Sequence, residues 1–311
     1  MRYAIGIDVG GTTIKAALIG ENARIYDSIS MDTPHSTGAI TSACSTLVTT
    51  LRDRVNAGDL EGVNGPIHPD ELISTIGVDV PGIVDEQRGI AEFSANLGWE
   101  NWRAHADFEA ALGTSVAFGH DVRNGAKAES HWGIALPNFF YIAIGTGIAS
   151  VLVINGAPVA PHGWAGEIGQ VPVPDPQRQG SLLPLEQVSS ASAIAKRAIE
   201  ADLVGEDAGA AEVYLLAGAG NEDAQDIIND AICALAHGIA PALAAFGPIP
   251  VVLGGGLANE GDPLCDHLEM ELSLALGIIP PPPVMTATLG SRSQVLGAAL
   301  SAFQCHDLLG Q

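Results

Sequence analysis

Two segments of the chain repeat one pattern: an apolar strand, a glycine turn and a second apolar strand. The first reads AIGIDVGGTTIKAALI and the second reads YIAIGTGIASVLVI. A repeated unit of this kind predicts two related domains. Around the two units, segments with the apolar pattern of strands alternate with segments that have the spacing of helices. We therefore expect an α/β protein with mixed sheets.

Apolar spacing and turn residues place the expected elements along the chain. Strands are expected at residues 3–7, 14–19, 23–28, 72–80, 89–93, 115–118, 139–144, 148–154, 250–253 and 284–287. Helices are expected at residues 40–55, 104–112, 124–132, 191–201, 210–216, 222–246, 263–276 and 294–303. Gly238 and Pro241 lie inside the longest of these helices, and we expect them to disturb it.

Composition excludes several classes of partner. The 311 residues include 36 acidic and 13 basic ones, for a net charge of −23. The cations Arg123, Lys127, Arg178 and Lys196 are scattered, and we interpret them as solvated surface charges. A chain of this kind offers no basic groove to nucleic acid or to an anionic membrane. Its acidic surface would also repel polyphosphate, which stays open as an alternative phosphoryl donor.

Cysteine spacing and the N-terminal segment bear on the compartment. The four cysteines are far apart and form no CxxC pair, and residues 1–30 lack the pattern of a signal peptide. No run of 18 uninterrupted apolar residues occurs. We expect a cytoplasmic protein with reduced thiols.

The turn from Asp8 to Thr13 is the first segment with chemical potential. Its glycines let backbone N–H groups approach an anion, and the hydroxyls of Thr12 and Thr13 add donors. Asp8 ends a buried strand, where a carboxylate needs a cation or water. This arrangement indicates a site for Mg²⁺ and a nucleotide, and an ordinary hairpin capped by Asp8 is the alternative. The P-loop and Rossmann motifs are absent from the sequence.

Two further glycine turns, Gly145-Thr146-Gly147 and Gly254-Gly255-Gly256, also stand at strand ends. Each is a common feature by itself, but three such turns together favour a phosphate-binding protein. Polar residues that suit a polyhydroxy ligand are Ser94, Asn96, His120, Asp121 and Glu167. Asp121 follows an apolar strand, where a general base can be held in place; a helix N-cap is its alternative role. For His120, a core or surface position is the alternative to ligand binding.

Specific motifs occur in an order that resembles the ROK family (repressor, open reading frame, kinase). They are IGIDVGGTTIKAALI, VDVPGIVD, SANLGW, GHDVRNGAKAE, IGTGI, GWAGEIG, PLEQVSSASAIA, VVLGGGLAN and GSRSQVLGAAL. The resemblance implies the two-lobed actin-like (ribonuclease H-like) ATPase fold, with the active site between the lobes. It implies an N-terminal lobe of residues 1–119, rejoined by the helix at 294–311, and a C-terminal lobe of residues 120–293.

The resemblance also implies roles for single residues. Asp121 corresponds to the catalytic base, and Asp8 would hold Mg²⁺ through water. ATP would be bound by Asp8, Gly10, Gly11, Thr12, Thr13, Gly145, Thr146, Gly147, Gly254, Gly255 and Gly256. The positions that correspond to sugar contacts in the family are Asn96, His120, Glu167, Gln170 and Glu186. We add Ser94, which belongs to the polar cluster described above.

The chain departs from the family pattern in two places. His120 stands where the family's sugar kinases usually have Asn. The family's zinc ligands, one His and three Cys, are replaced by Gln170, Gln177, Gln179 and Pro184. Amides and proline are not zinc ligands, so we expect a protein without zinc. We expect two or three leucines of the run 182–185 to be buried and to stabilise the altered loop, which should be more mobile than a zinc-bound one.

The resemblance and the intact motifs imply an ATP-dependent sugar kinase for a hexose or an N-acetylhexosamine, and a homodimer. A DNA-binding regulator of the same family is the first alternative. The acidic charge and the short segment before the first strand argue against it. A catalytically weak sugar binder is the second alternative, suggested by His120 and Gln170.

Overall fold

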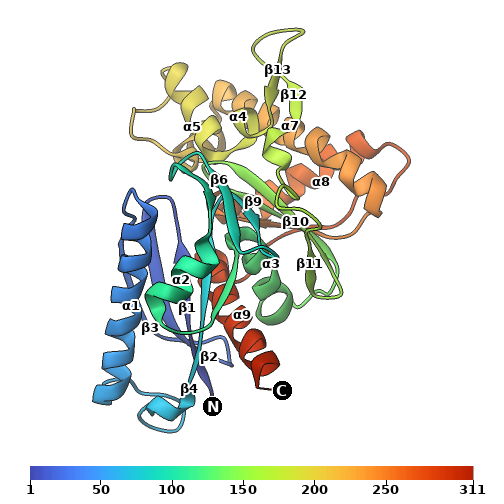
Figure 1. The fold of residues 1–311 in the computed structure, drawn as a ribbon. Helices are drawn as coiled ribbons and strands as arrows, with labels where there is room; N and C mark the ends of the chain where they lie inside the picture. Colours follow the sequence, from blue (N-terminus) through green and yellow to red (C-terminus); the bar gives the residue numbers. More distant parts are fainter. Residues whose placement is uncertain (311) are drawn as a thin grey trace. The chain divides into compact units, whose positions relative to one another are not determined.

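The computed structural model describes residues 1–310, which form two compact units (Figure 1). The first unit holds residues 1–135, 160–165 and the chain from residue 292 onward; the second holds residues 136–159 and 166–291. The sequence predicted that the first lobe ends at residue 119, whereas the first unit of the structure continues to residue 135. The difference is chiefly the helix at 121–132, which packs with the first unit against the C-terminal helix.

A five-stranded mixed sheet forms the centre of the first unit, in the order β3-β2-β1-β4-β8. Its strands are β1 (Tyr3–Val9), β2 (Thr13–Gly20), β3 (Ile25–Asp32), β4 (Leu72–Val80) and β8 (Val116–His120). The first three strands are antiparallel, and β4 and β8 continue parallel to β1. Strand β1 is apolar and almost wholly buried, as expected for a central strand covered on both faces.

The first unit also contains a three-stranded sheet and four α-helices. The small sheet is made of β5 (Ile83–Asp85), β6 (Ile90–Ser94) and β7 (Trp99–Trp102). The helices are α1 (Thr37–Ala57), α2 (Ala104–Leu112), α3 (Asp121–Trp132) and α9 (Ser293–Leu309), with a 3₁₀ turn at Pro69–Glu71. A Cβ at Gly77 on β4 would lie 1.8 Å from the Ala298 carbonyl oxygen on α9. The absence of a side chain at Gly77 thus lets α9 pack closely on the sheet.

The second unit repeats the strand pattern of the first. Its sheet has the order β11-β10-β9-β14-β15, again with three antiparallel strands followed by two parallel ones. The strands are β9 (Phe139–Ile144), β10 (Ile148–Ile154), β11 (Ala157–Val159), β14 (Val251–Gly254) and β15 (Val284–Thr286). This correspondence between the two sheets is what the repeated strand, turn and strand pattern predicts.

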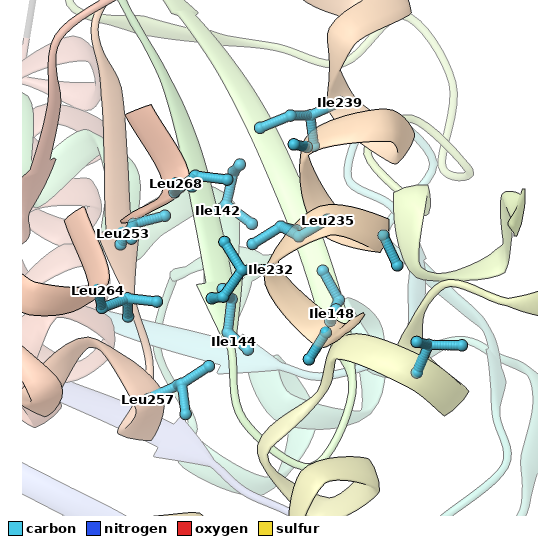
Figure 2. Packing of buried hydrophobic residues seen from close by; sticks show 14 of the residues in the cluster. Ile142, Ile144, Ile148, Ile232, Leu235, Ile239, Leu253, Leu257, Leu264 and Leu268 are labelled. Carbon is cyan, nitrogen blue, oxygen red and sulfur yellow. The ribbon is translucent and has the colours of Figure 1, made fainter. Parts of the chain in front are cut away.

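Helices enclose one apolar core in the second unit (Figure 2). They are α4 (Glu186–Ser189), α5 (Ala191–Glu200), α6 (Ala210–Gly218), α7 (Glu222–Phe246) and α8 (Asp262–Leu276), with 3₁₀ turns at Ile168–Gln170, Gly256–Glu260 and Gly290–Arg292. Ile232, Leu235 and Ile239 of α7 point at the isoleucines of β9.

Helix α7 continues unbroken through Gly238 and Pro241, so the expected disturbance is wrong. Gly238 makes room for a neighbour, because a Cβ there would lie 2.8 Å from a methyl group of Leu185. By length and composition α7 is also the one helix among residues 1–310 that could cross a membrane. Of the 18-residue apolar window of α7 that meets this criterion, 61% is buried, as in the core helix of a globular protein.

The segment with the glutamines Gln177 and Gln179 belongs to an unexpected hairpin of β12 (Pro172–Pro174) and β13 (Leu182–Pro184). Leu185 is fully buried, as expected, and Leu183 is half-buried. Leu182 is 63% exposed, so at most two of the three leucines contribute buried surface. Its position near the tip of a two-stranded hairpin leaves it without a second layer to pack on.

Candidate active site

In the first unit, acidic residues gather where the central strands end. Asp8 near the end of β1 is paired in register with Lys15 on β2 and with Asp79 on β4. Burial raises the pKa of Asp8 to about 6, and the Lys15 ammonium only partly offsets this. A half-buried carboxyl group that is only weakly compensated is suited to a nearby cation.

The turn from Gly10 to Thr13 is held in a fixed shape. The Gly10 amide donates to the Thr13 carbonyl at 3.0 Å, and Thr33 binds the turn from the side, donating from its hydroxyl to Gly10 and from its amide to Thr12. A Cβ at Gly10 would lie 2.8 Å from the Thr13 oxygen, which explains a glycine there. Gly11 and Thr12 remain exposed at the tip, where a ligand can reach them.

Asp121 is the first residue of α3, directly after β8. The helix N-cap is His120 and not Asp121, because the His120 Nδ1 accepts from the amides of Val122 and Arg123. Burial and the neighbouring Arg123 lower the pKa of His120 to about 3. The ring is therefore neutral, and its Nδ1 contact with the Asp121 carboxylate at 3.2 Å is no ion pair.

The remaining sequence-predicted residues of the first unit lie at the small sheet. Ser94 ends β6 and is buried, and its hydroxyl accepts from the Leu97 amide at 3.4 Å; Asn96 is exposed in the following turn. A Cβ at Gly82 would lie 3.2 Å from Ser94, and the His120 ring binds the Gly82 backbone. Ser94 and His120 are thus neighbours through Gly82, and a contact of either with sugar stays a prediction.

Both glycine turns of the second unit lie at the same end of its sheet. The Gly145 amide donates to the Gly147 carbonyl at 3.0 Å, and the Ala191 amide at the start of α5 donates to the Gly145 carbonyl at 3.0 Å. Gly254 is paired in register with Ala143 on β9, beside the turn. Gly255 has a φ of 81°, and a Cβ there would lie 2.4 Å from the Ile144 oxygen, so only glycine fits.

Glu186 at the start of α4 is the best-defined polar group of the second unit. Gln170 donates from Nε2 to its Oε1 at 2.7 Å. Its Oε2 lies 2.8 Å from where a Cβ of Gly147 would be and 3.0 Å from that of Gly169. The carboxylate is thus held between the glycine turn and the 3₁₀ turn that also carries Glu167.

A pocket of about 530 Å³ opens beside Glu186 in the second unit. Its lining includes Thr146 of the glycine turn and Gln177 of the hairpin, with Ser190 and Lys196 from the far side. Of the former zinc-ligand positions, Gln170 binds Glu186 and Gln177 lines the pocket. Among residues 1–310 no group of three His, Cys, Asp or Glu residues is placed to hold a metal ion; the expectation that the protein contains no zinc stays a prediction.

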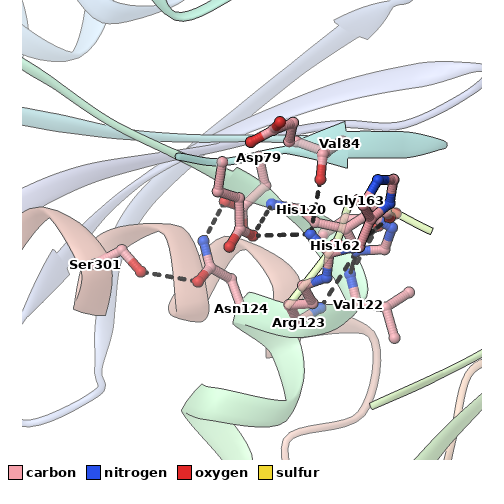
Figure 3. Close-up of polar contacts among 12 residues, drawn as sticks. Asp79, Val84, His120, Val122, Arg123, Asn124, His162, Gly163 and Ser301 are labelled. Carbon is pink, nitrogen blue, oxygen red and sulfur yellow. Dashed lines mark hydrogen bonds and ion pairs between the residues drawn. The ribbon is translucent and has the colours of Figure 1, made fainter. Parts of the chain in front are cut away.

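Two basic residues interpreted as solvated surface charges are not freely exposed: Arg123 is buried and Lys127 is half-buried. Arg123 is 3% exposed and donates to the carbonyls of Val84, at 2.9 Å, and Gly163, at 2.6 Å (Figure 3). Lys127 is half-buried and donates to Ser301 at 3.0 Å. Helical spacing does not distinguish these positions, because their partners lie on distant parts of the chain.

Sequence reasoning also missed a carboxyl group in the middle of the first sheet. Asp79 has no exposed surface, and Asn124 donates to its Oδ1 (Figure 3). Burial raises the pKa of Asp79 well above its usual range, and the charges of Asp8 and Asp121 add to this effect. A signal was present: an Asp inside the apolar run Leu72–Val80 is unusual for a central strand.

Comparison with known proteins places the chain among relatives with the same fold. It is 27% identical to a glucokinase from Halalkalibacterium halodurans, over 86% of each chain. It is 29% identical to an N-acetyl-D-glucosamine kinase from Haemophilus influenzae, over 94% of this chain and 97% of that protein. The structure of a ROK hexokinase from Thermus thermophilus superimposes with a TM-score of 0.78 at 25% identity, over 99% and 100% of the two chains.

These similarities agree with the sheet order and identify the two-lobed actin-like ATPase fold. The motifs that suggested the family extend over most of the chain. The model of the ROK family matches residues 4–304. The chain therefore belongs to the ROK family.

Proposed function

We propose that this protein is a sugar kinase that transfers a phosphoryl group from ATP to a hexose or an N-acetylhexosamine, with Asp121 as general base. The names of the relatives, glucokinase and N-acetylglucosamine kinase, support the reaction and both substrate classes. The observation that carries the proposal is in the first unit. Asp8 lies near the end of β1 and Asp121 directly follows β8, two strands of one sheet, and the Gly10–Thr13 turn comes after β1.

In this mechanism Asp121 accepts the proton of the attacking sugar hydroxyl. Phosphoryl transfer depends mainly on positioning and charge neutralisation, so one fixed carboxylate with backbone donors meets its needs. The His120 cap and the buried Arg123 hold the first turn of α3, and with it Asp121. In the second unit, Glu167 and Glu186 would accept sugar hydroxyls.

Residues of the chain also suit ATP and Mg²⁺. Asp8 supplies a half-buried carboxylate without full compensation, which fits a hydrated divalent cation. The exposed tip at Gly11 and Thr12 and the turns at Gly145–Gly147 and Gly254–Gly256 would bind phosphates and adenosine. Bound Mg²⁺ would neutralise charge on the phosphates.

A kinase assay tests the proposal. ADP release is measured with glucose, mannose, fructose, allose and N-acetylhexosamines, with ATP or polyphosphate as donor. Asp121→Asn keeps the size of the side chain and removes the base, and general-base catalysis contributes about 10²- to 10⁴-fold, so kcat should fall by that amount. A variant that keeps more than about a third of the wild-type kcat contradicts the assignment.

Sugar binding without turnover would support the catalytically weak binder instead. Calorimetric titration of wild-type protein with the same sugars separates the two outcomes. A homodimer, a cytoplasmic location and the lack of a nucleic-acid partner stay predictions, of which sedimentation measurements test the first.

A further inference from the structure

Asp79 is a fully buried acidic residue of the first sheet to which the proposed reaction gives no role. It lies near the end of the interior strand β4, in register with Asp8 on β1 on one side and Gly119 on β8 on the other. It has no exposed surface, and its Oδ2 has no hydrogen-bond partner among the described residues. Burying a carboxyl group in this way costs stability, so a functional reason is required.

A chain of hydrogen bonds connects this carboxyl to helix α3 (Figure 3). Asn124 donates from Nδ2 to the Asp79 Oδ1, and its own Oδ1 accepts from the Ser301 hydroxyl at 2.9 Å. The Ser301 oxygen accepts in turn from the Lys127 ammonium at 3.0 Å. The side chain of Asn124 is thus bound at both ends, to β4 and to α9.

The backbone is shaped to admit this link. A Cβ at Gly119 would lie 2.3 Å from the Asn124 Nδ2 and 3.0 Å from the Asp79 Oδ1. A Cβ at Gly297 on α9 would lie 2.1 Å from the Asn124 carbonyl oxygen. Gly119 thus leaves room for the Asn124 side chain beside Asp79, and Gly297 lets α9 approach the backbone of α3 at Asn124.

The link acts on the position of Asp121. Asn124 lies one helical turn after Asp121 and on the same side of α3, as residues three apart do. Anchoring Asn124 to the sheet therefore fixes the rotation of the helix about its axis at its first turn. We propose that Asp79, acting through Asn124, is a positioning residue that holds Asp121 in place for phosphoryl transfer; this rests on the proposed function.

The test compares variants of the full chain that remove or keep the acceptor. In Asp79→Ala the acceptor is lost, and kcat should fall roughly 10- to 100-fold, the cost of a small misplacement of a catalytic group. The KM values for sugar and ATP should change less than about 3-fold, since neither ligand is contacted. Asp79→Asn keeps an acceptor oxygen for Asn124 and should restore most of the lost kcat.

Two further variants separate this role from a general loss of stability. Thr75→Ala removes another buried polar group of β4, one that contacts His306 on α9, and should leave kcat unchanged. Asn124→Ala should reproduce the loss, and it remains informative if Asp79→Ala fails to fold. Combining Asn124→Ala with Asp79→Ala should cost no more than about 2-fold beyond either variant, because both break one link.

Hydrogen exchange gives a readout that does not depend on turnover. In Asp79→Ala the amides of Val122 and Arg123 should exchange faster than in wild type, and in Thr75→Ala they should not. An inactive wild type would refute the proposed function while exchange still tests the anchoring of α3. The positioning role is refuted if Asp79→Ala keeps kcat and exchange unchanged. It is also refuted if Asp79→Asn is as damaged as Asp79→Ala, or if the effects of Asp79→Ala and Asn124→Ala multiply.

Discussion

Replacing Gln170 by leucine removes the one side-chain donor that the structure gives to Glu186. The Gln170 Nε2 lies 2.7 Å from Glu186 Oε1, a distance typical of a hydrogen bond to a charged acceptor. Leucine has nearly the same size and no polar atom. The change therefore tests whether Gln170, which stands where the family has a zinc-bound histidine, keeps Glu186 oriented for a sugar hydroxyl.

The energy lost in Gln170→Leu depends on how far solvent reaches the hydrogen bond between Gln170 and Glu186. A hydrogen bond to a charged group contributes about 1.5–3 kcal/mol net when buried, and solvent at an exposed donor reduces this to about 1 kcal/mol. Gln170 is exposed, which selects the lower value. The second oxygen of Glu186 stays confined by Gly147 and Gly169, so the carboxylate can turn only a little. We expect the KM for sugar to rise roughly 3- to 10-fold, about 1 kcal/mol.

Steady-state kinetics over sugar and ATP concentrations checks this expectation. The KM for ATP should stay within about 2-fold, because the substitution changes a contact proposed for the sugar and not for the nucleotide. Gln179→Leu is the matched control, an exposed glutamine of the same loop for which the structure shows no bond to Glu186. An unchanged sugar KM in Gln170→Leu, or an equal rise in the control, would refute the reasoning.

Three further predictions concern pH, zinc and a glycine turn. In the unfolded chain His120 has a pKa of 6.5, whereas burial lowers its pKa to about 3 in the folded protein. Between these values only the unfolded state binds a proton at this ring. The unfolding free energy of wild type relative to His120→Asn should therefore fall by about 1.4 kcal/mol per pH unit on acidification in urea titrations, and a flat difference would contradict this. Elemental analysis of untagged protein should find no stoichiometric zinc, and chelation with Mg²⁺ in excess should leave activity intact; zinc lost together with activity would show that other ligands exist. Gly255→Ala should lower the free energy of unfolding by about 1–3 kcal/mol, because its φ of 81° is strained for alanine and the Ile144 oxygen is close. Gly256→Ala, where a Cβ would meet open space, should cost less than about 1 kcal/mol. Equal losses in thermal unfolding of the two variants would argue against the strain.

Local patterns predicted most of the secondary structure. The alternation of apolar residues in YIAIGTGIASVLVI is a property of neighbours in sequence, and it predicts β9, its turn and β10 correctly. The short strands at 157–159, 172–174 and 182–184 were missed, because three-residue strands that contain proline carry no periodic signal. Helix α3 begins at Asp121, earlier than its apolar spacing suggested, because the His120 cap and tertiary contacts extend it.

The sequence by itself determined the class of the fold, the doubled strand unit and the family. Turn chemistry and strand periodicity are local, and the ROK motifs are contiguous. The hydrogen-bonded link of Asp79, Asn124 and Ser301 depends on tertiary packing, since these residues lie 45 and 177 positions apart along the chain. The burial of Arg123 and the partial burial of Lys127 depend on it as well. A side chain's burial depends on which distant elements pack against it, and no local pattern contains that information.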